Sequence, residues 1–189
     1  MRHLVEVGCI GESSWHNFLS EEARLDIIEP IPRNIAAIKE FYKDYSNVFV
    51  HPFAVWKEPG TIKMYDLERV SYIDGVESPA IGTYLGMASP TESARTLSYE
   101  PKEEDLIEVE AITFDQFDPG TIDMLDMDAE GCEWYILEKM LSRPKIMAIE
   151  TGVDRNHPFM EQIDEWAKDN GYVEFRHYDS NSWFKRLPK

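Results

Sequence analysis

The chain has 189 residues, of which 43% are hydrophobic, and this composition suits one globular domain with a sizeable core. Its 19 basic and 36 acidic residues give a formal net charge of -17. Phosphate backbones and anionic membrane surfaces would repel such a chain, so we expect neither nucleic acid nor a membrane as a partner.

The cysteine content and the apolar runs bear on the cellular compartment. Cys9 and Cys132 are the only cysteines, too few for a disulfide framework and without metal-ligand spacing. No apolar run approaches the length of a membrane span, and the first residues reach Glu6 too soon for a signal peptide. We therefore expect a cytoplasmic protein.

A buried strand is predicted at residues 3–7, and a turn with two glycines, Gly8 and Gly11, follows it ahead of a helix predicted at residues 14–20. A strand, a glycine turn and a helix open a nucleotide-binding unit, because glycine allows positive φ and lets a ligand approach the main chain. Two glycines alone are also typical of a plain turn, so the interpretation depends on the residues of the second strand.

The second strand is predicted at residues 26–30, and its Glu29 lies 21 positions beyond Gly8 (29 minus 8). An acid about 20 residues after the glycine turn accepts hydrogen bonds from both ribose hydroxyls in such folds. A carboxylate suits this task because it offers two acceptor oxygens and no donor. The alternative is an exposed acid at a strand end.

The middle of the chain alternates between regular and irregular segments. Asn34 is predicted to cap the next helix, and residues 61–65 alternate like an edge strand. Residues 73–104 are rich in glycine, proline, serine and threonine, so we expect a flexible loop on the substrate side; a solvated insertion without ligand contact is the alternative. Residues 108–112 return to strand alternation, ahead of a short helix that Thr113 starts through a capping box.

The stretch from Ile122 to Glu133 is a short apolar run that ends in acids and a glycine and leads into a helical pattern. The pattern predicts a strand that feeds a helix, with Asp128 and Glu130 at the carboxyl end of the strand. Open α/β sheets place their ligand-binding groups at that edge. Four acids within eight residues either face water or await a ligand with donors or positive charge, since buried unpaired charges are costly.

The C-terminal part of the chain adds a strand at residues 145–150, whose Glu150 is aimed at the same edge as Asp128. His157 follows in a loop, where it is either a base or an ordinary surface histidine. An amphipathic helix is predicted at residues 158–170, and two strands that form a hairpin close the chain.

Residues 125–133, read Leu-Asp-Met-Asp-Ala-Glu-Gly-Cys-Glu, resemble the (Leu-Lys-Ile-Asp-Val-Glu-Gly-Ala-Glu) signature of FkbM-type S-adenosylmethionine-dependent methyltransferases. Asp126 stands where the family usually has lysine. Shorter resemblances lie around Glu6, Glu29 and Ala54. The matching positions of the signature are Asp128, Glu130, Gly131 and Glu133.

The resemblance implies a Rossmann-like class I methyltransferase fold, an α/β architecture in which a mostly parallel seven-stranded sheet has helices on both faces and a C-terminal antiparallel hairpin. The resemblance spans Val5 to Phe184, and we expect residues 1–189 to form one methyltransferase-like domain. The implied cofactor is S-adenosylmethionine. The residues expected to hold it are Glu6, Gly8, Cys9, Gly11, Glu29, Pro30, Ala54 and Asp128.

The implied reaction is O-methylation of a hydroxyl on a sugar or another small molecule. A hydroxyl acceptor needs a base within hydrogen-bond reach, and the candidates are Asp128, Glu130, Glu150 and His157. Asp126 and Asp128 on one strand face would hold Mg²⁺ together with Glu150, but no ligand spacing is diagnostic, so we predict no metal. Because no helix is predicted ahead of the first strand, a second subunit of a homo-oligomer is one way to wall the site.

Two other functions remain open. A catalytically inactive protein that only binds the cofactor or a partner would explain the glycine turn, which has two residues between its glycines where the family usually has three. A nicotinamide dehydrogenase would need a fuller Gly-x-Gly-x-x-Gly turn. Binding of S-adenosylmethionine or of NAD distinguishes these functions.

Overall fold

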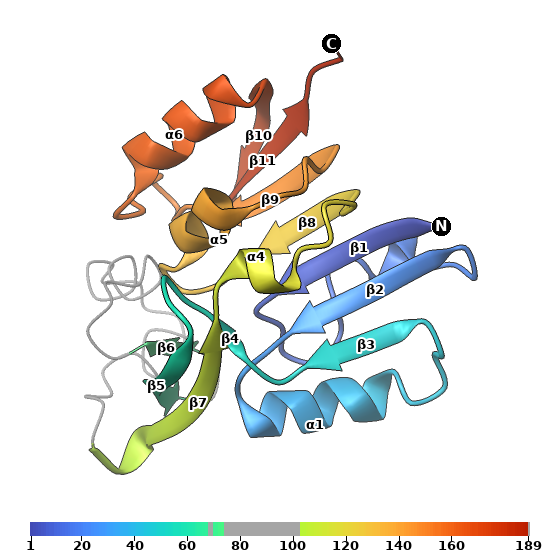
Figure 1. Cartoon of the computed structure of the whole chain (residues 1–189), viewed down its shortest axis with the longest axis vertical. Coiled ribbons are helices and arrows are strands. Elements are labelled where there is room, and N and C mark those ends of the chain that lie inside the picture. The colour runs from blue at the N-terminus through green and yellow to red at the C-terminus, as the bar shows by residue number, and fades with distance from the viewer. Residues whose placement is uncertain (68–69, 74–102, 189) are drawn as a thin grey trace.

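A seven-stranded sheet is the centre of the computed structural model, which describes residues 1–67, 70–73 and 103–188 (Figure 1). In sheet order, its strands are β10 (Tyr172–Tyr178), β11 (Asn181–Arg186), β9 (Ile146–Glu150), β8 (Met124–Met127), β1 (Arg2–Val7), β2 (Ala23–Ile28) and β3 (Val48–His51). The five strands from β9 to β3 pair in parallel, whereas β11 runs antiparallel to both β9 and β10. β10 therefore points in the same direction as the parallel strands.

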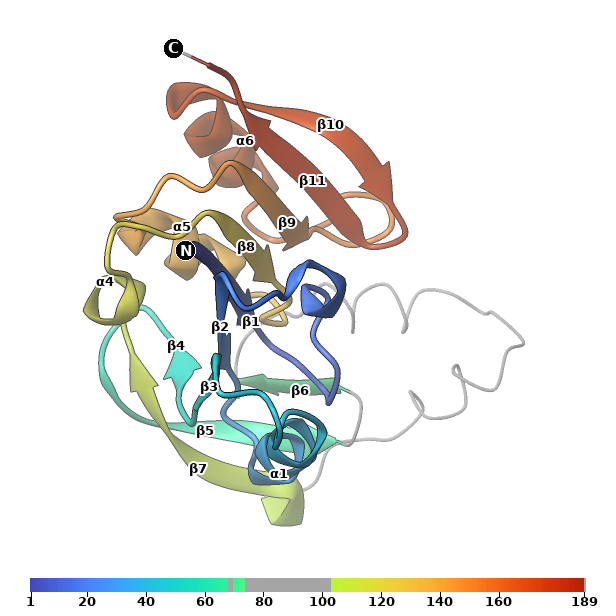
Figure 2. The ribbon, with the colours of Figure 1, turned by 90° about the vertical axis from the view of Figure 1, so that its right-hand side faces the viewer.

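Helices cover both faces of this sheet. Successive side chains of a strand point to opposite faces, and Leu4 and Val5 of β1 are both fully buried. Val5 belongs to the core under α5 (Glu133–Lys139) and α6 (Met160–Asp169), while Leu4 belongs to the core under α1 (Pro32–Phe41). Figure 2 shows α5 and α1 on opposite sides of the sheet. The predicted class I methyltransferase fold is thereby confirmed, including its C-terminal hairpin.

A second sheet lies beyond the carboxyl ends of β1, β2 and β3 (Figure 1). In sheet order, its strands are β4 (Ala54–Val55), β7 (Leu106–Ile112), β5 (Gly60–Leu67) and β6 (Val70–Ile73). β5 is antiparallel to both β7 and β6 and lies between them, so the prediction of an edge strand at residues 61–65 was wrong. The cause is β6, a partner strand that no sequence pattern indicated. Most of the loop predicted at residues 73–104 lies outside the described residues.

The short helical segments near the N-terminus differ from the prediction. The helix expected at residues 14–20 is a single 3-10 turn, η1 (His16–Phe18). Trp15 precedes it, is almost fully buried, and donates from Nε1 to the carbonyl oxygen of Val5 at 2.9 Å, which holds the segment against β1. Asn34 does not cap α1, because that helix already begins at a proline, whose missing N–H needs no partner in the first turn.

The capping box at Thr113 is confirmed. It starts α4 (Phe114–Phe117), and the Thr113 N–H donates to the side-chain oxygen of Gln116 at 3.1 Å. A further 3-10 turn, η2 (Glu103–Asp105), precedes β7. In the part of the chain that the structure describes, no helix has both the length and the apolar character needed to cross a bilayer.

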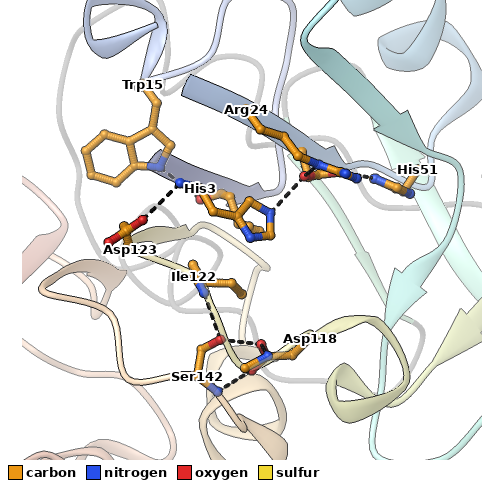
Figure 3. A network of polar contacts seen from close by, with 11 residues as sticks. His3, Trp15, Arg24, His51, Asp118, Ile122, Asp123 and Ser142 are labelled. Carbon is orange, nitrogen blue, oxygen red and sulfur yellow. Dashed lines mark hydrogen bonds and ion pairs between the residues drawn. The ribbon is translucent and has the colours of Figure 1, made fainter. Parts of the chain in front are cut away.

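The carboxylate of Asp26 in β2 is buried and hydrogen-bonded to side chains from β1, β2 and β3. Figure 3 shows these side chains, which are His3, Arg24 and His51. Asp26 of β2 is fully buried and accepts hydrogen bonds from Nε2 of His3 at 2.8 Å and from Nε2 of His51 at 2.7 Å. Arg24 donates to the same carboxylate from Nε at 2.6 Å and from Nη2 at 2.8 Å. Burial opposes ionisation of Asp26, but these hydrogen bonds outweigh it and hold its pKa well below the ordinary value.

Candidate active site

A cavity of about 250 Å³ lies at the carboxyl ends of β1, β2 and β8. Gly8 follows β1, Glu29 follows β2 and Asp128 follows β8, and all three line the cavity, as expected for strand ends in an open α/β sheet. The second sheet contributes Ala54 to the wall. Of the residues predicted to hold the cofactor, Gly11 is the one that does not line this cavity.

Gly8 lies where two strand ends cross at close range. Its φ is +82°, a conformation that favours glycine, and its N–H donates to the carbonyl oxygen of Ile28 at 3.0 Å. The N–H of Asp128 donates to the carbonyl oxygen of Val7 at 2.9 Å. A Cβ on Gly8 would lie 1.8 Å from the carbonyl oxygen of Asp128, so only glycine fits this crossing.

Glu29 has its carboxylate fixed by the protein on two sides. It is almost fully buried, and its Oε2 accepts the Cys9 N–H at 3.1 Å. Its Oε1 accepts the Ile31 N–H at 2.8 Å and the side-chain amide of Asn34 at 3.2 Å. Burial raises the pKa of Glu29, and these hydrogen bonds oppose the rise. Asn34, predicted as a helix cap, therefore acts on the carboxylate, a role that its sequence position did not indicate.

The signature loop wraps around the buried carboxylate of Glu133. Oε1 of Glu133 accepts the Ala129 N–H at 2.7 Å, and Oε2 accepts the Gly131 N–H at 3.0 Å. Between them, Glu130 has a φ of +51°, which is unusual for a residue with a side chain and is maintained here by the surrounding hydrogen bonds. The last acid of the signature thus shapes the loop that carries Asp128.

His157 supports the same loop instead of facing the cavity. It is almost fully buried, and its Nδ1 accepts the Phe159 N–H at 3.0 Å. This contact assigns the ring proton to Nε2, which lies 2.7 Å from Oε2 of Glu133 and donates to it. Both ring nitrogens are occupied, and His157 does not line the cavity, so its placement argues against the predicted role as a base.

The other three predicted bases meet at one edge of the cavity. One carboxylate oxygen from each of Asp128, Glu130 and Glu150 lies within 4.8 Å of the other two. Burial and the neighbouring charge of Asp128 raise the pKa of Glu150 to about 11, and burial also raises the pKa of Asp128. Asp128 and Glu130 line the cavity. Asp128 is exposed as a residue although neighbouring groups enclose its carboxylate, so it is a more accessible base than the buried Glu150.

Asp126 lies apart from this cluster, contrary to the arrangement considered for Mg²⁺. β8 ends at Met127, so the alternation that would align Asp126 with Asp128 does not continue past the strand. Asp126 instead acts on Glu6, whose pKa is raised to about 8 by burial and by the charge of Asp126. Glu6 lines the cavity and accepts the Ser14 N–H at 2.9 Å.

Comparison with known proteins gives a family match. The family model described as methyltransferase FkbM domain matches residues 9–174. The SAH-bound methyltransferase PaMTH1 of Podospora anserina is similar at 13% identity and a TM-score of 0.44, over 99% of this chain and 72% of that chain. The N-methyltransferase NodS of Bradyrhizobium japonicum WM9 is similar at 11% identity and a TM-score of 0.43, over 99% of this chain and 86% of that chain. No curated protein matches the chain.

Proposed function

The chain belongs to the methyltransferase FkbM domain family of S-adenosylmethionine-dependent enzymes, and we propose that it methylates a hydroxyl of a small molecule such as a sugar. One observation carries the proposal. The glycine turn, the acid after β2 and the acid after β8 line the same cavity, through Gly8, Glu29 and Asp128.

The residues of the cavity fit the chemistry of the cofactor. Gly8 leaves room for a ligand to approach the main chain, and Ala54 and Val55 offer an apolar wall for an adenine ring. Within the described residues, Oε2 of Glu29 accepts one hydrogen bond, so it retains an acceptor position for a ribose hydroxyl. Asp128 and Glu130 place negative charge beside the cavity, which suits a positively charged sulfonium.

Bound S-adenosylmethionine supplies a methyl group on an already activated leaving group. The protein therefore has to orient the acceptor hydroxyl and remove its proton, and orientation alone can supply about 7–11 kcal/mol of the barrier. We propose that the carboxylate of Asp128 accepts the proton of the acceptor hydroxyl, because Asp128 lines the cavity. Glu150 belongs to the same cluster of carboxylates but is buried and does not line the cavity, so it is less accessible to an acceptor than Asp128.

Calorimetry with S-adenosylmethionine tests the cofactor site, and mass spectrometry after incubation with hydroxylated small molecules tests the reaction. We expect binding, and a gain of one methyl group on a sugar or a related acceptor. Methylation of amines but of no hydroxyl would refute the proposed acceptor class.

A catalytically inactive binding module is the second candidate. The observation that favours it is the carboxylate of Glu29, which already accepts hydrogen bonds from Cys9, Ile31 and Asn34. If the protein is such a module, it should bind a partner or the cofactor without turnover on any acceptor.

The sequence also suggests a cellular compartment and an assembly. We propose that the protein is cytoplasmic and that it can form a homo-oligomer, which light scattering would test.

A further inference from the structure

Three carboxylates from two separate segments of the chain meet beside the cavity. Asp128 and Glu130 belong to the signature loop, and Glu150 ends β9. One oxygen of each lies within 4.8 Å of the others. Among the described residues, the charges that raise the pKa of Glu150 are those of other carboxylates, Asp128, Glu130 and Glu133. Negative charges at this spacing repel one another, so a compensating positive charge would stabilise the cluster.

Glu150 gives an independent indication that a ligand belongs here. Its side chain is only 7% exposed, and within the described residues its Oε2 has no hydrogen-bond partner. Buried carboxylate oxygens nearly always have a hydrogen-bond partner, because an acceptor that is removed from water and finds no partner destabilises the folded protein. The residue that carries this unpaired oxygen is a member of the carboxylate cluster.

We propose that Asp128, Glu130 and Glu150 bind one divalent cation such as Mg²⁺ or Mn²⁺. Carboxylate oxygens are the ligands that these cations prefer. Mg²⁺ binds oxygens at roughly 2.0–2.1 Å, so two of its ligand oxygens are at most roughly 4 Å apart. The three carboxylate oxygens, each within 4.8 Å of the other two, would have to approach one another by less than about 1 Å to bind it. The sequence predicted no metal, because the ligands come from different segments without a diagnostic spacing.

The cation would act on the acceptor. Three protein ligands fill only part of the coordination shell, and the remaining positions can take water or an acceptor oxygen. Since Asp128 and Glu130 line the cavity, the cation would lie at its wall. A hydroxyl bound to a divalent cation loses its proton more readily and is held in one position. This catalytic role rests on the proposed function, whereas binding of the cation does not.

Titration of EDTA-treated, dialysed protein with Mn²⁺ alone tests the site, by calorimetry and by loss of the free Mn²⁺ signal in electron paramagnetic resonance. We expect one Mn²⁺ per chain, displaced by excess Mg²⁺. Glu150→Gln replaces one carboxylate ligand by an amide of nearly the same shape and should weaken binding at least tenfold. The matched control is Glu138→Gln, which removes an exposed carboxylate from α5 and should leave the affinity unchanged.

Absence of Mn²⁺ binding, or equal affinity in Glu150→Gln and Glu138→Gln, would overturn the proposal. If circular dichroism indicates that Glu150→Gln does not fold, then Glu130→Gln carries the same expectation, because its side chain is partly exposed. S-adenosylmethionine binding is measured separately on metal-free protein. Binding of Mn²⁺ without binding of S-adenosylmethionine would contradict the proposed function and support the cation site. Binding of S-adenosylmethionine without binding of Mn²⁺ would contradict the cation site alone.

Discussion

Glu133 and His157 form a buried pair in which Nε2 of the histidine donates to Oε2 of the glutamate over 2.7 Å, and neither side chain is exposed to solvent. The pair joins the signature loop to the loop that follows β9. Because the same carboxylate accepts the N–H groups of Ala129 and Gly131, the pair determines the shape of the loop that presents Asp128 to the cavity.

Glu133→Gln should destabilise the fold and weaken cofactor binding. Glutamine keeps one acceptor oxygen, so at least one of the donors from Ala129, Gly131 and His157 loses its partner. We expect the free energy of unfolding to fall by about 2–4 kcal/mol, as measured in urea. Glu138→Gln, which changes an exposed glutamate of the same helix, should alter it by less than about 0.5 kcal/mol. Equal values for the two variants would contradict the role assigned to Glu133.

Gly8→Ala should abolish cofactor binding. The added Cβ would lie 1.8 Å from the carbonyl oxygen of Asp128, so β1 and β8 would have to separate at the cavity. Gly120→Ala is a matched control, since Gly120 also has positive φ but has no atom within 4 Å of the added Cβ. The control should cost about 1–2 kcal/mol and leave the affinity for S-adenosylmethionine unchanged. Normal affinity in Gly8→Ala would contradict the close crossing of the two strand ends.

Asp26 should make the protein sensitive to acid. Its pKa in the folded protein lies below the unfolded value of about 4, so its contribution to stability is complete above that pH and is lost as the pH falls further. Asp26→Asn should lower the free energy of unfolding at pH 7 by about 3–5 kcal/mol and flatten its decline below about pH 5.

The control for this prediction is Asp164→Asn, which removes a partly exposed ion pair with Arg155. It should cost less than about 1 kcal/mol and keep the acid slope of the unchanged chain. An Asp26→Asn variant with the same acid slope as the unchanged chain would show that other groups govern the response.

Asp128→Asn should lower kcat by about 10²–10⁴-fold while the fold persists. Asparagine has nearly the same shape as aspartate, but its side-chain amide does not accept a proton near neutral pH and so cannot act as a base. Asp115→Asn, at an exposed position on α4, is the control and should retain full activity. Circular dichroism and calorimetry accompany the rate measurement, and unchanged turnover in Asp128→Asn would remove this residue from the mechanism.

Much of the main sheet could be predicted from local patterns. The four residues of β8 are all buried, and such short apolar runs bounded by turns are typical of parallel strands. The second sheet was harder to predict, because β7 pairs with β4 and β5, whose residues are far away in the sequence. Local alternation indicates that a strand exists but does not identify its neighbours, which is why β5 was predicted at an edge.

By itself, the sequence determined the class of the fold, the family and the convergence of Gly8, Glu29 and Asp128, since parallel strands deliver their carboxyl ends to one edge. Only the tertiary structure decided what each acid does. It buried Glu133 against His157 and brought Glu150 to Asp128, because burial and partners depend on contacts between segments that no local pattern encodes.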